Sequence, residues 1–237
     1  VLRKKIAVIG AGAAGFFGAI RMKSLLPHAT VIVFEKSNKM LAKVKVSGGG
    51  RCNVTHSCFE VSQLIKNYPR GSKELRQAFM QFACGDTVNW FFDRGVELKT
   101  ESDGRMFPVT NDSQTIIDCL MDEAETSGVQ FSLGSNIKKI AGKNNQIELT
   151  FDNDDSELFD AVLIATGGHP NKSGFNWMSS TNHSIVDPVP SLFTFNFRDK
   201  TISALMGISV PVAQVKIVGT KLEYSGPLLI THWGISG

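Results

Sequence analysis

"KIAVIGAGAAGFFGAIRMKSLLPHATVIVFEK", residues 5–36, is the stretch that decides the fold. The run at residues 6–9 is short and apolar, as expected of a strand buried on both faces of a parallel sheet. A glycine-rich turn at residues 10–15, an apolar helical segment, a β-branched strand at residues 30–34 and the acid Glu35 follow. These parts fit within about 30 residues, the length of one βαβ unit. The stretch therefore predicts a Rossmann-like α/β fold with a parallel sheet.

The turn has the spacing G-x-G-x-x-G, and each glycine has a physical reason. Gly10 permits a tight turn, Gly12 lets the backbone approach a pyrophosphate, and Gly15 lets helix and strand pack closely. The helix N-terminus offers free N–H groups and a positive dipole end to phosphates. Glu35, 20 residues beyond Gly15, is spaced to accept hydrogen bonds from ribose hydroxyls. The unit predicts a dinucleotide site but does not distinguish NAD from FAD.

A second strand end, in "FDAVLIATGGHP" at residues 159–170, helps to distinguish the two cofactors. Residues 161–164 form another apolar strand, and "ATGG" follows it. Because ligands of doubly wound sheets lie beyond the carboxyl ends of the strands, this turn is expected to face the same ligand as the first one. The long excursion before this strand resembles flavoproteins of the glutathione reductase type, in which an "ATG" strand end lies against the flavin. This resemblance favours FAD.

The most unusual stretch is "VKVSGGGRCNVTH", residues 44–56. Three consecutive glycines cost conformational entropy, which makes sense where the backbone passes close to a flat or bulky group. Ser47, Arg51 and Asn53 add hydrogen-bonding groups, and Arg51 could pair with a pyrophosphate or an anionic substrate. Cys52 has no partner at CxxC spacing, so we expect it to be a small packed residue and not a redox thiol.

Five motifs occur in the order found in one known family. They are "KVSGGGRCNVTH", "GRMFPVTNDSQTIIDCLMDEAETSGV" at 104–129, "ATGGHPNKSG", "DPVPSLFTF" at 187–195 and "GPLLITHWGISG" at 226–237. Together they resemble the YhiN/BaiN-like bacterial flavoproteins, which are NAD(P)/FAD-dependent oxidoreductases. His56 departs from the family, in which Asn is more common at this position. The resemblance covers most of the chain and implies a glutathione-reductase-type FAD-binding fold.

The resemblance also implies where the cofactor lies: FAD follows the glycine turn, the loop at residues 47–53 and the second strand end, with Glu35 on the adenosine ribose. The cofactor-binding residues implied in this way are Gly10, Gly12, Ala13, Ala14, Gly15, Glu35, Lys36, Lys43, Ser47, Gly48, Gly49, Gly50, Arg51, Cys52, Asn53, Ala165, Thr166 and Gly167. The implied chemistry is hydride transfer through flavin N5, with NAD(P)H as one candidate co-substrate. The sequence identifies neither the substrate nor a catalytic residue.

The composition changes after Pro188 and Pro190 towards strand-rich sequence. We therefore expect an FAD-binding Rossmann-like domain at residues 1–188, with a β-hairpin or meander crossover before its last strand. The beginning of a mostly β middle or substrate domain is expected at residues 189–237. Members of the family run longer and return to a glycine-rich segment over the flavin. We expect this chain to lack that C-terminal part of its FAD-binding domain, which could leave it an inactive fragment.

Two further helices are predicted within residues 72–94. Their expected N-caps are Ser72 and Asp86, and Gly95 follows as a stop signal. Four aromatic residues have the spacing of a buried helical face, so we expect core packing from Phe79, Phe82, Trp90 and Phe91.

Composition limits the partners. The 237 residues carry a net charge of only +3 with no dense basic run, so we expect a small-molecule substrate and no nucleic acid. No apolar stretch reaches the length of about 18 residues that would indicate a membrane span. The four cysteines have neither CxxC pairs nor metal spacing with histidines, so we expect a cytoplasmic protein with reduced thiols and no metal. The oligomeric state is not indicated.

Two alternatives remain open at this point. An NAD-dependent dehydrogenase would use only the first βαβ unit, and it would leave the glycines at 48–50 and the segment at 166–168 unexplained. A non-catalytic nucleotide-binding or RNA-associated module is suggested by the positive net charge and by Arg51. Steep salt dependence of RNA binding, without flavin turnover, would identify the second alternative.

Overall fold

The computed structural model describes residues 3–189, 194–196 and 199–236. The chain divides into two compact units, Val1–Ile185 and Val186–Gly237. The division falls three residues before the domain boundary expected from sequence. The expected fold class is confirmed: the first unit is an α/β unit with a parallel sheet, and the second contains an antiparallel sheet.

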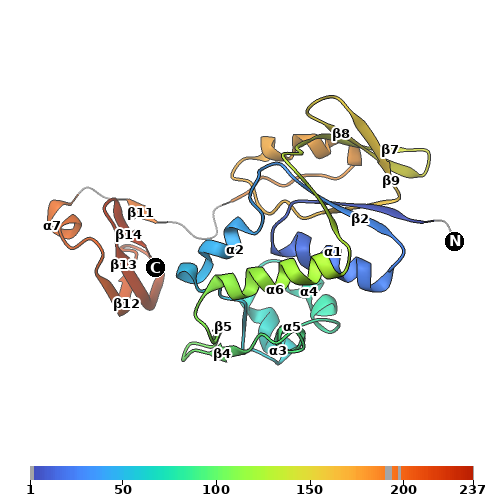
Figure 1. Ribbon diagram of the computed structural model, residues 1–237. Coiled ribbons are helices and arrows are strands. Elements are labelled where there is room, and N and C mark those ends of the chain that lie inside the picture. The colour runs from blue at the N-terminus through green and yellow to red at the C-terminus, as the bar shows by residue number, and fades with distance from the viewer. Residues whose placement is uncertain (1–2, 190–193, 197–198, 237) are drawn as a thin grey trace. The chain divides into compact units, whose positions relative to one another are not determined.

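The first unit is built on four parallel strands in the order β10-β1-β2-β6 (Figure 1). Their bounds are β1 Lys5–Ile9, β2 Thr30–Glu35, β6 Gln130–Leu133 and β10 Ala161–Ile164. The chain runs outward from β1 through β2 to β6 and then returns to the other side of β1 as β10. The direction of winding therefore reverses between β1 and β10, and this switch point is where doubly wound sheets bind their ligands.

The sheet is covered on both faces, as the apolar strand at residues 6–9 predicted. Ile6 and Val8 of β1 belong to a core with helices α1 (Ala13–Leu25) and α6 (Ser113–Thr126). The alternate residues Ala7 and Ile9 belong to a second core. That core includes a three-stranded antiparallel meander, made of β7 Ile137–Lys143, β8 Gln146–Phe151 and β9 Ser156–Phe159. The expected β-meander crossover before the last parallel strand is thus present.

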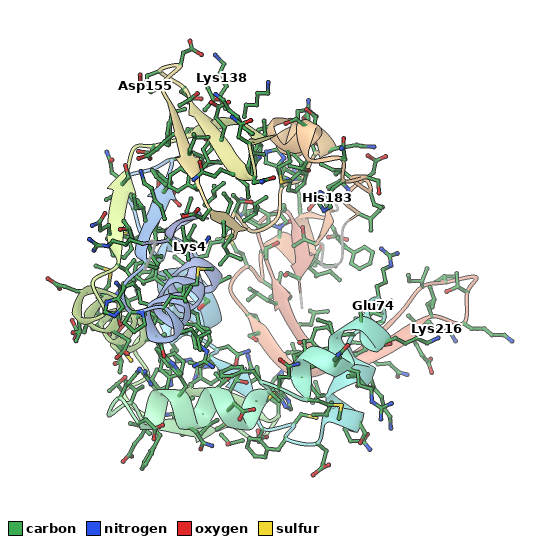
Figure 2. The ribbon with its side chains drawn as sticks, turned by 90° about the vertical axis from the view of Figure 1, so that its right-hand side faces the viewer. Lys4, Glu74, Lys138, Asp155, His183 and Lys216 are labelled. Carbon is green, nitrogen blue, oxygen red and sulfur yellow. The ribbon has the colours of Figure 1, made fainter. Side chains whose placement is uncertain are left out.

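Figure 1 shows the meander and the two helices on opposite faces of the parallel sheet. Figure 2 shows Lys138 and Asp155 together at one end of the meander, where the turn between β8 and β9 returns. Lys138 pairs there with Asp154. Leu149 in the middle strand is fully buried, so the meander replaces the helix that covers this face in simpler Rossmann units.

Both covering helices follow directly from their sequences. The side chain of Asp112 accepts a hydrogen bond from the Gln114 N–H at 2.8 Å and caps α6. Ile116, Leu120 and Ala124 follow at helical spacing and are buried. The helix α1 buries a face of Gly15, Phe16, Ala19 and Ile20.

The segment between β2 and α6 adds short helices and a small sheet of order β3-β5-β4. Its helices are α2 Ala42–Val46, η1 Ser47–Gly50, α3 Val61–Leu64, η2 Ile65–Asn67, α4 Ser72–Phe79 and α5 Cys84–Phe92. Its strands are β3 Thr55–His56, β4 Leu98–Thr100 and β5 Arg105–Pro108. A further 3₁₀ segment, η3 Lys172–Thr181, follows β10.

The two predicted helices α4 and α5 exist, but their predicted N-caps are wrong. Gly71 with φ of 79° precedes α4, and Ala83 precedes α5. Asp86 lies in the first turn of α5, where its carboxylate accepts a hydrogen bond from the Ala83 N–H at 2.8 Å. An acid in the first turn can therefore stabilise the helix start without being the cap itself.

The expected core packing of the aromatic residues holds for only part of the set. Phe91 is buried and Trp90 packs against the same core. Phe82 is 39% exposed, and Phe79 is half-buried on α4.

The second unit contains an antiparallel sheet of order β11-β14-β13-β12. Its elements are β11 Phe195–Asn196, α7 Lys200–Ser203, β12 Ser209–Lys216, β13 Glu223–Ile230 and β14 Gly234–Ser236. Residues 190–193 of the motif "DPVPSLFTF" lie outside the described residues. Within the described ranges, no helix combines the length and apolar character needed to cross a membrane.

Candidate functional site

The glycine turn after β1 and the turn after β10 meet at the switch point. Ile9 pairs with Ile164 in the parallel ladder, and the Ala165 N–H donates to the Ile9 carbonyl at 2.8 Å. Gly10 has φ of 108°, and a Cβ on it would lie 2.6 Å from the Ala165 carbonyl oxygen. The two strand ends therefore form neighbouring walls of one region, as the sequence predicted.

Gly15 is required by packing inside the protein. A Cβ on Gly15 would lie 1.9 Å from the carbonyl oxygen of Gly10. No real Cβ approaches a backbone oxygen so closely, so any other residue would push α1 away from β1. The close helix–strand contact predicted for the third glycine of the motif is therefore present.

Gly12 is different, because nothing inside the protein requires glycine there. Its φ is −90°, which any residue adopts, and no heavy atom lies within 4 Å of the position of a Cβ. Gly12 is the N-cap of α1, and the helix has neither a side-chain cap nor an acidic residue in its first turn. Within the described residues, no acceptor is found for the N–H groups of Ala13, Ala14 and Gly15. An open glycine before unpaired helix N–H groups fits an anionic group such as a pyrophosphate.

Glu35, at the end of β2, is held beside this turn by three hydrogen bonds. One carboxylate oxygen accepts from the Ala11 N–H at 3.0 Å, and the other accepts from the N–H and hydroxyl of Ser37. A carboxylate has about four lone-pair sites, so the oxygen bonded to Ala11 can still accept one donor. A ribose hydroxyl can supply that donor.

The charge of Glu35 is favoured by its surroundings. Burial raises the pKa of Glu35, but hydrogen bonds from Ala11 and Ser37, together with the charge of Lys36, more than offset this effect. The pKa of the carboxyl therefore lies below its ordinary value of 4.5. Glu35 is ionised at neutral pH and acts as an acceptor only.

The segment around α2 joins the same region. The Leu41 N–H donates to the Ala11 carbonyl at 2.8 Å, and Leu41 itself has the unusual φ of 54°. A Cβ built on Gly167 would lie 3.6 Å from the amine of Lys43. The turn after β10 is therefore close to a cation from α2. Sequence reasoning found Lys43 and Gly167, but it missed Leu41 and Ser37, which carry no recognisable motif signal.

The glycine run in "SGGGRCN" forms the short 3₁₀ segment η1. Gly48, Gly49 and Gly50 have φ values of 56°, 70° and 85°, so all three need glycine for their backbone conformation. A Cβ on Gly48 would lie 2.8 Å from both the Asn53 nitrogen and the Phe107 ring. At Gly49 and Gly50 it would meet nothing within 4 Å, so this part of the loop presents bare backbone.

Arg51 is already engaged within the protein. Its guanidinium pairs with Glu101 at 2.5 Å and lies 4.1 Å from the centroid of the Phe107 ring. Any anion at this position must compete with Glu101 for the charge. Burial raises the pKa of the Cys52 thiol above its ordinary value, and a hydrogen bond with Ser47 offsets this only in part. Cys52 is therefore a protonated thiol at neutral pH, which does not suit a redox nucleophile.

These contacts bring together one part of the predicted site. They connect the glycine turn, Glu35, the α2 segment with Lys43, and the turn after β10. Gly49, Gly50 and Arg51 follow α2 in the chain, but no hydrogen bond between the described residues joins them to the glycine turn or to Glu35. Among the residues that the structure covers, no cluster of three or more His, Cys, Asp or Glu side chains could hold a metal ion.

A parallel sheet with a glycine turn, an unpaired helix N-terminus and an anchored acid at its switch point defines a Rossmann-type dinucleotide-binding protein. The chain matches the family described as "HI0933-like protein Rossmann domain" over residues 4–235, and it belongs to that family. This finding confirms the family resemblance inferred from the motifs.

Curated relatives match almost the whole chain. The ribosomal RNA dihydrouridine synthases of Haemophilus influenzae and Escherichia coli are 27% and 28% identical to it, each over 97% of this chain. The 3-dehydro-bile acid delta(4,6)-reductase of Clostridium scindens is 25% identical over 98% of this chain. In each case the match covers 58% of the relative's own length.

A solved structure shares the fold. It is the open conformation of a flavocytochrome c3 fumarate reductase, which superposes with a TM-score of 0.60 at 20% identity. The similarity covers 88% of this chain and 47% of that chain. At this level of identity the likeness concerns the fold alone.

Proposed function

We propose that this chain is the FAD-binding part of a flavin-dependent oxidoreductase. The observation that carries the proposal is the open Gly12 at the switch point, with unpaired N–H groups behind it and the acceptor Glu35 beside it. Membership of a Rossmann family, and the "reductase" and "synthase" names of the relatives, support a redox role. The fold shared with a flavocytochrome is consistent with it.

The residues of this chain would divide the binding of FAD between them. The N–H groups at the start of α1 would bind the pyrophosphate, and the Glu35 carboxylate would accept a hydrogen bond from a ribose hydroxyl. The bare backbone at Gly49 and Gly50 and the turn at Ala165, Thr166 and Gly167 lie along the rest of the cofactor. The bound flavin would supply hydride transfer through N5, while the protein supplies orientation and electrostatics. NAD(P)H is the candidate donor of electrons.

An NAD-dependent dehydrogenase remains the alternative enzyme. It accounts for Gly12 and Glu35, but it assigns no role to the second glycine-rich turn, at Thr166 and Gly167, which lies beside the first. The resemblance of the motifs to YhiN/BaiN-like flavoproteins and the fold shared with a flavocytochrome support FAD. FAD is therefore the better proposal.

The relatives suggest two substrate classes. The bile acid reductase favours a small molecule, in line with the diffuse charge of this chain. The two ribosomal RNA dihydrouridine synthases favour RNA, which is the second candidate. The sequence-based expectation of no nucleic acid stays a prediction.

Titration of the purified chain with FAD and, separately, with NAD tests the proposal. We expect the fluorescence of FAD to be quenched on binding and the melting temperature of the protein to rise. NAD at the same concentration should not raise the melting temperature. Tight NAD binding without FAD binding would favour the dehydrogenase. Anaerobic addition of NADH or NADPH to the FAD-loaded protein then tests the electron donor through bleaching of the flavin absorbance. Binding and reduction are separate readouts, so a chain that binds FAD without turnover still supports the cofactor assignment.

A further inference from the structure

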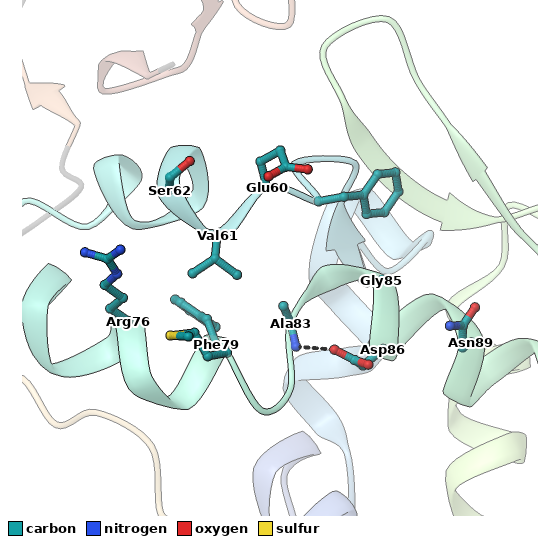
Figure 3. A pocket seen from close by; sticks show the side chains of 11 residues that line it. Glu60, Val61, Ser62, Arg76, Phe79, Ala83, Gly85, Asp86 and Asn89 are labelled. Atoms are coloured by element: carbon teal, nitrogen blue, oxygen red, sulfur yellow. Dashed lines mark hydrogen bonds between the residues drawn. The ribbon is translucent and has the colours of Figure 1, made fainter.

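A hollow apart from the proposed cofactor site lies among the helices α3, α4 and α5 (Figure 3). Its volume is about 540 Å³, which falls within the roughly 300–1,000 Å³ typical of small-molecule sites. None of the residues predicted to bind FAD lines it. It is therefore a separate feature that the cofactor assignment does not explain.

One side of the hollow is cationic. Arg76 projects from α4, and it is exposed. Across the described part of the chain, its guanidinium makes no ion pair with a carboxylate. Lys73 lies one turn earlier on the same helix, and Arg70 precedes the helix. The acids Glu60, in the lining, and Glu74, on α4, are also nearby, but the Arg76 guanidinium has no ion-pair partner among the described residues and suits a phosphate group.

Large apolar side chains that are open to solvent also line the hollow. Phe59 is 54% exposed and Met80 is 73% exposed. The Phe79 ring packs against Tyr68, with the two ring centroids 5.3 Å apart. Large apolar side chains gathered around a hollow are uncommon on a surface without a binding role. A flat ring is the ligand that such side chains cover best.

The side opposite Arg76 carries hydrogen-bonding groups from α5. Figure 3 shows Asp86 and Asn89 on this side, with Val61 and Phe79 between them and Arg76. One Asp86 oxygen accepts from the Ala83 N–H, which leaves acceptor capacity on the carboxylate. Acidic acceptors disfavour an isolated anion, and a purely hydrocarbon ligand would leave them unpaired. A ring with N–H donors on its edge satisfies them.

We propose that this hollow binds a nucleotide. The phosphate pairs with Arg76, the base lies against Phe79 and Met80, and the edge of the base donates to Asp86 or Asn89. Aromatic stacking combined with a backbone cation is how proteins hold unstacked nucleotides. The nucleotide is either free or part of a single-stranded RNA, and the two sources share this chemistry. The assignment stands on the hollow alone and does not require FAD to bind.

Only a short stretch of chain separates the hollow from the glycine-rich loop. Phe59 follows Asn53 by six residues, and six residues span at most about 20 Å when fully extended. A strand of a few nucleotides covers such a distance. A nucleotide held here could therefore belong to a longer ligand that also reaches the loop.

Fluorescence anisotropy of labelled octauridine, titrated with the 237-residue chain, tests the proposal. Replacing Arg76→Ala should weaken binding about tenfold and lower the slope of log K against log salt by about 0.7. Met80→Ala removes an exposed side chain and should weaken binding without lowering the melting temperature. Arg21→Ala is the matched control, because Arg21 is an exposed arginine on α1. Because Arg21 does not line the hollow, that variant should bind octauridine as the wild type does.

Unlabelled UMP and cholate then serve as competitors. Displacement by UMP identifies a free nucleotide as sufficient, while RNA binding that UMP does not displace identifies a nucleotide within a strand. Both results support the proposal if Arg76→Ala weakens binding and Arg21→Ala does not. Equal effects of the two arginine variants, absence of binding by both nucleotide probes, or displacement of the RNA by cholate and not by UMP would overturn it.

Discussion

Replacing Gly12→Ala is expected to weaken FAD binding without harming the fold. Gly12 has φ of −90°, and a Cβ there meets no heavy atom within 4 Å. A glycine-to-alanine change at a compatible φ stabilises a protein by about 0.4–1 kcal/mol through the unfolded chain. Alanine is a poorer N-cap than glycine, which offsets part of this gain. We therefore expect the free energy of unfolding without FAD to change by less than about 0.5 kcal/mol.

The loss of FAD affinity follows from where the added methyl group lies. It occupies the space before the N–H groups of Ala13, Ala14 and Gly15, where the pyrophosphate is proposed to bind. Moving the phosphates outward breaks at least one hydrogen bond to a charged group, worth about 1.5–3 kcal/mol. This energy corresponds to roughly ten- to 150-fold weaker binding.

The assay is an FAD titration by fluorescence, together with melting temperatures with and without FAD. Because a ligand stabilises the folded state in proportion to its affinity, Gly12→Ala should melt like the wild type alone but gain less from FAD. Gly15→Ala is the control for a structural glycine, since its Cβ would lie 1.9 Å from the Gly10 oxygen. That variant should melt lower even without FAD. A folded Gly12→Ala protein with wild-type FAD affinity would refute the reasoning.

Three further predictions concern individual side chains. The pKa of Glu35 is lowered in the folded state, so the ionised carboxylate stabilises the fold above pH 4.5. This stabilisation is lost as the pH falls through the lower pKa of the folded state. The difference in melting temperature between the wild type and Glu35→Gln should therefore shrink over that acid range. Leu149→Ala should lower the free energy of unfolding by about 2–5 kcal/mol in chemical denaturation, because Leu149 is fully buried in the meander core. Arg51→Ala should cost about 1 kcal/mol of stability through lost pairing with Glu101 and Phe107. It should also weaken FAD binding less than Gly12→Ala does, and a larger loss in titration would assign Arg51 to the cofactor.

The parts of the fold that sequence predicted are those that local patterns encode. The apolar strand at residues 6–9, the glycine turn and Glu35 lie within one βαβ unit, so their spacing fixes their geometry. Gly10 and Ala165 lie side by side although they are far apart in the sequence. This proximity was predicted because each follows an apolar strand that ends in a glycine turn. The rule that ligands lie at the carboxyl ends of parallel strands connected them.

The parts that sequence missed depend on contacts between distant residues. Nothing around Arg51 indicates that Glu101, 50 residues later, balances its charge. Leu41 adopts a left-handed conformation that its residue type does not favour, and its N–H reaches Ala11. Asp is a residue type that commonly caps helices, yet the helix starts before Asp86 and its carboxylate accepts a hydrogen bond from the Ala83 N–H. In each case the residue type alone did not determine the conformation or the contact, which depend on a partner elsewhere in the fold.

The glycines of the site show how structure adds to a sequence motif. Sequence gives Gly10, Gly12 and Gly15 equal standing, but Gly10 and Gly15 are explained by contacts inside the protein. Gly49 and Gly50 meet no neighbour, yet their positive φ values already require glycine, so substitutions there would confound strain with ligand contact. Gly12 alone among these five has neither a backbone nor a packing reason for glycine. Its identity must then come from something outside the polypeptide, which is why the cofactor proposal is tested at this position.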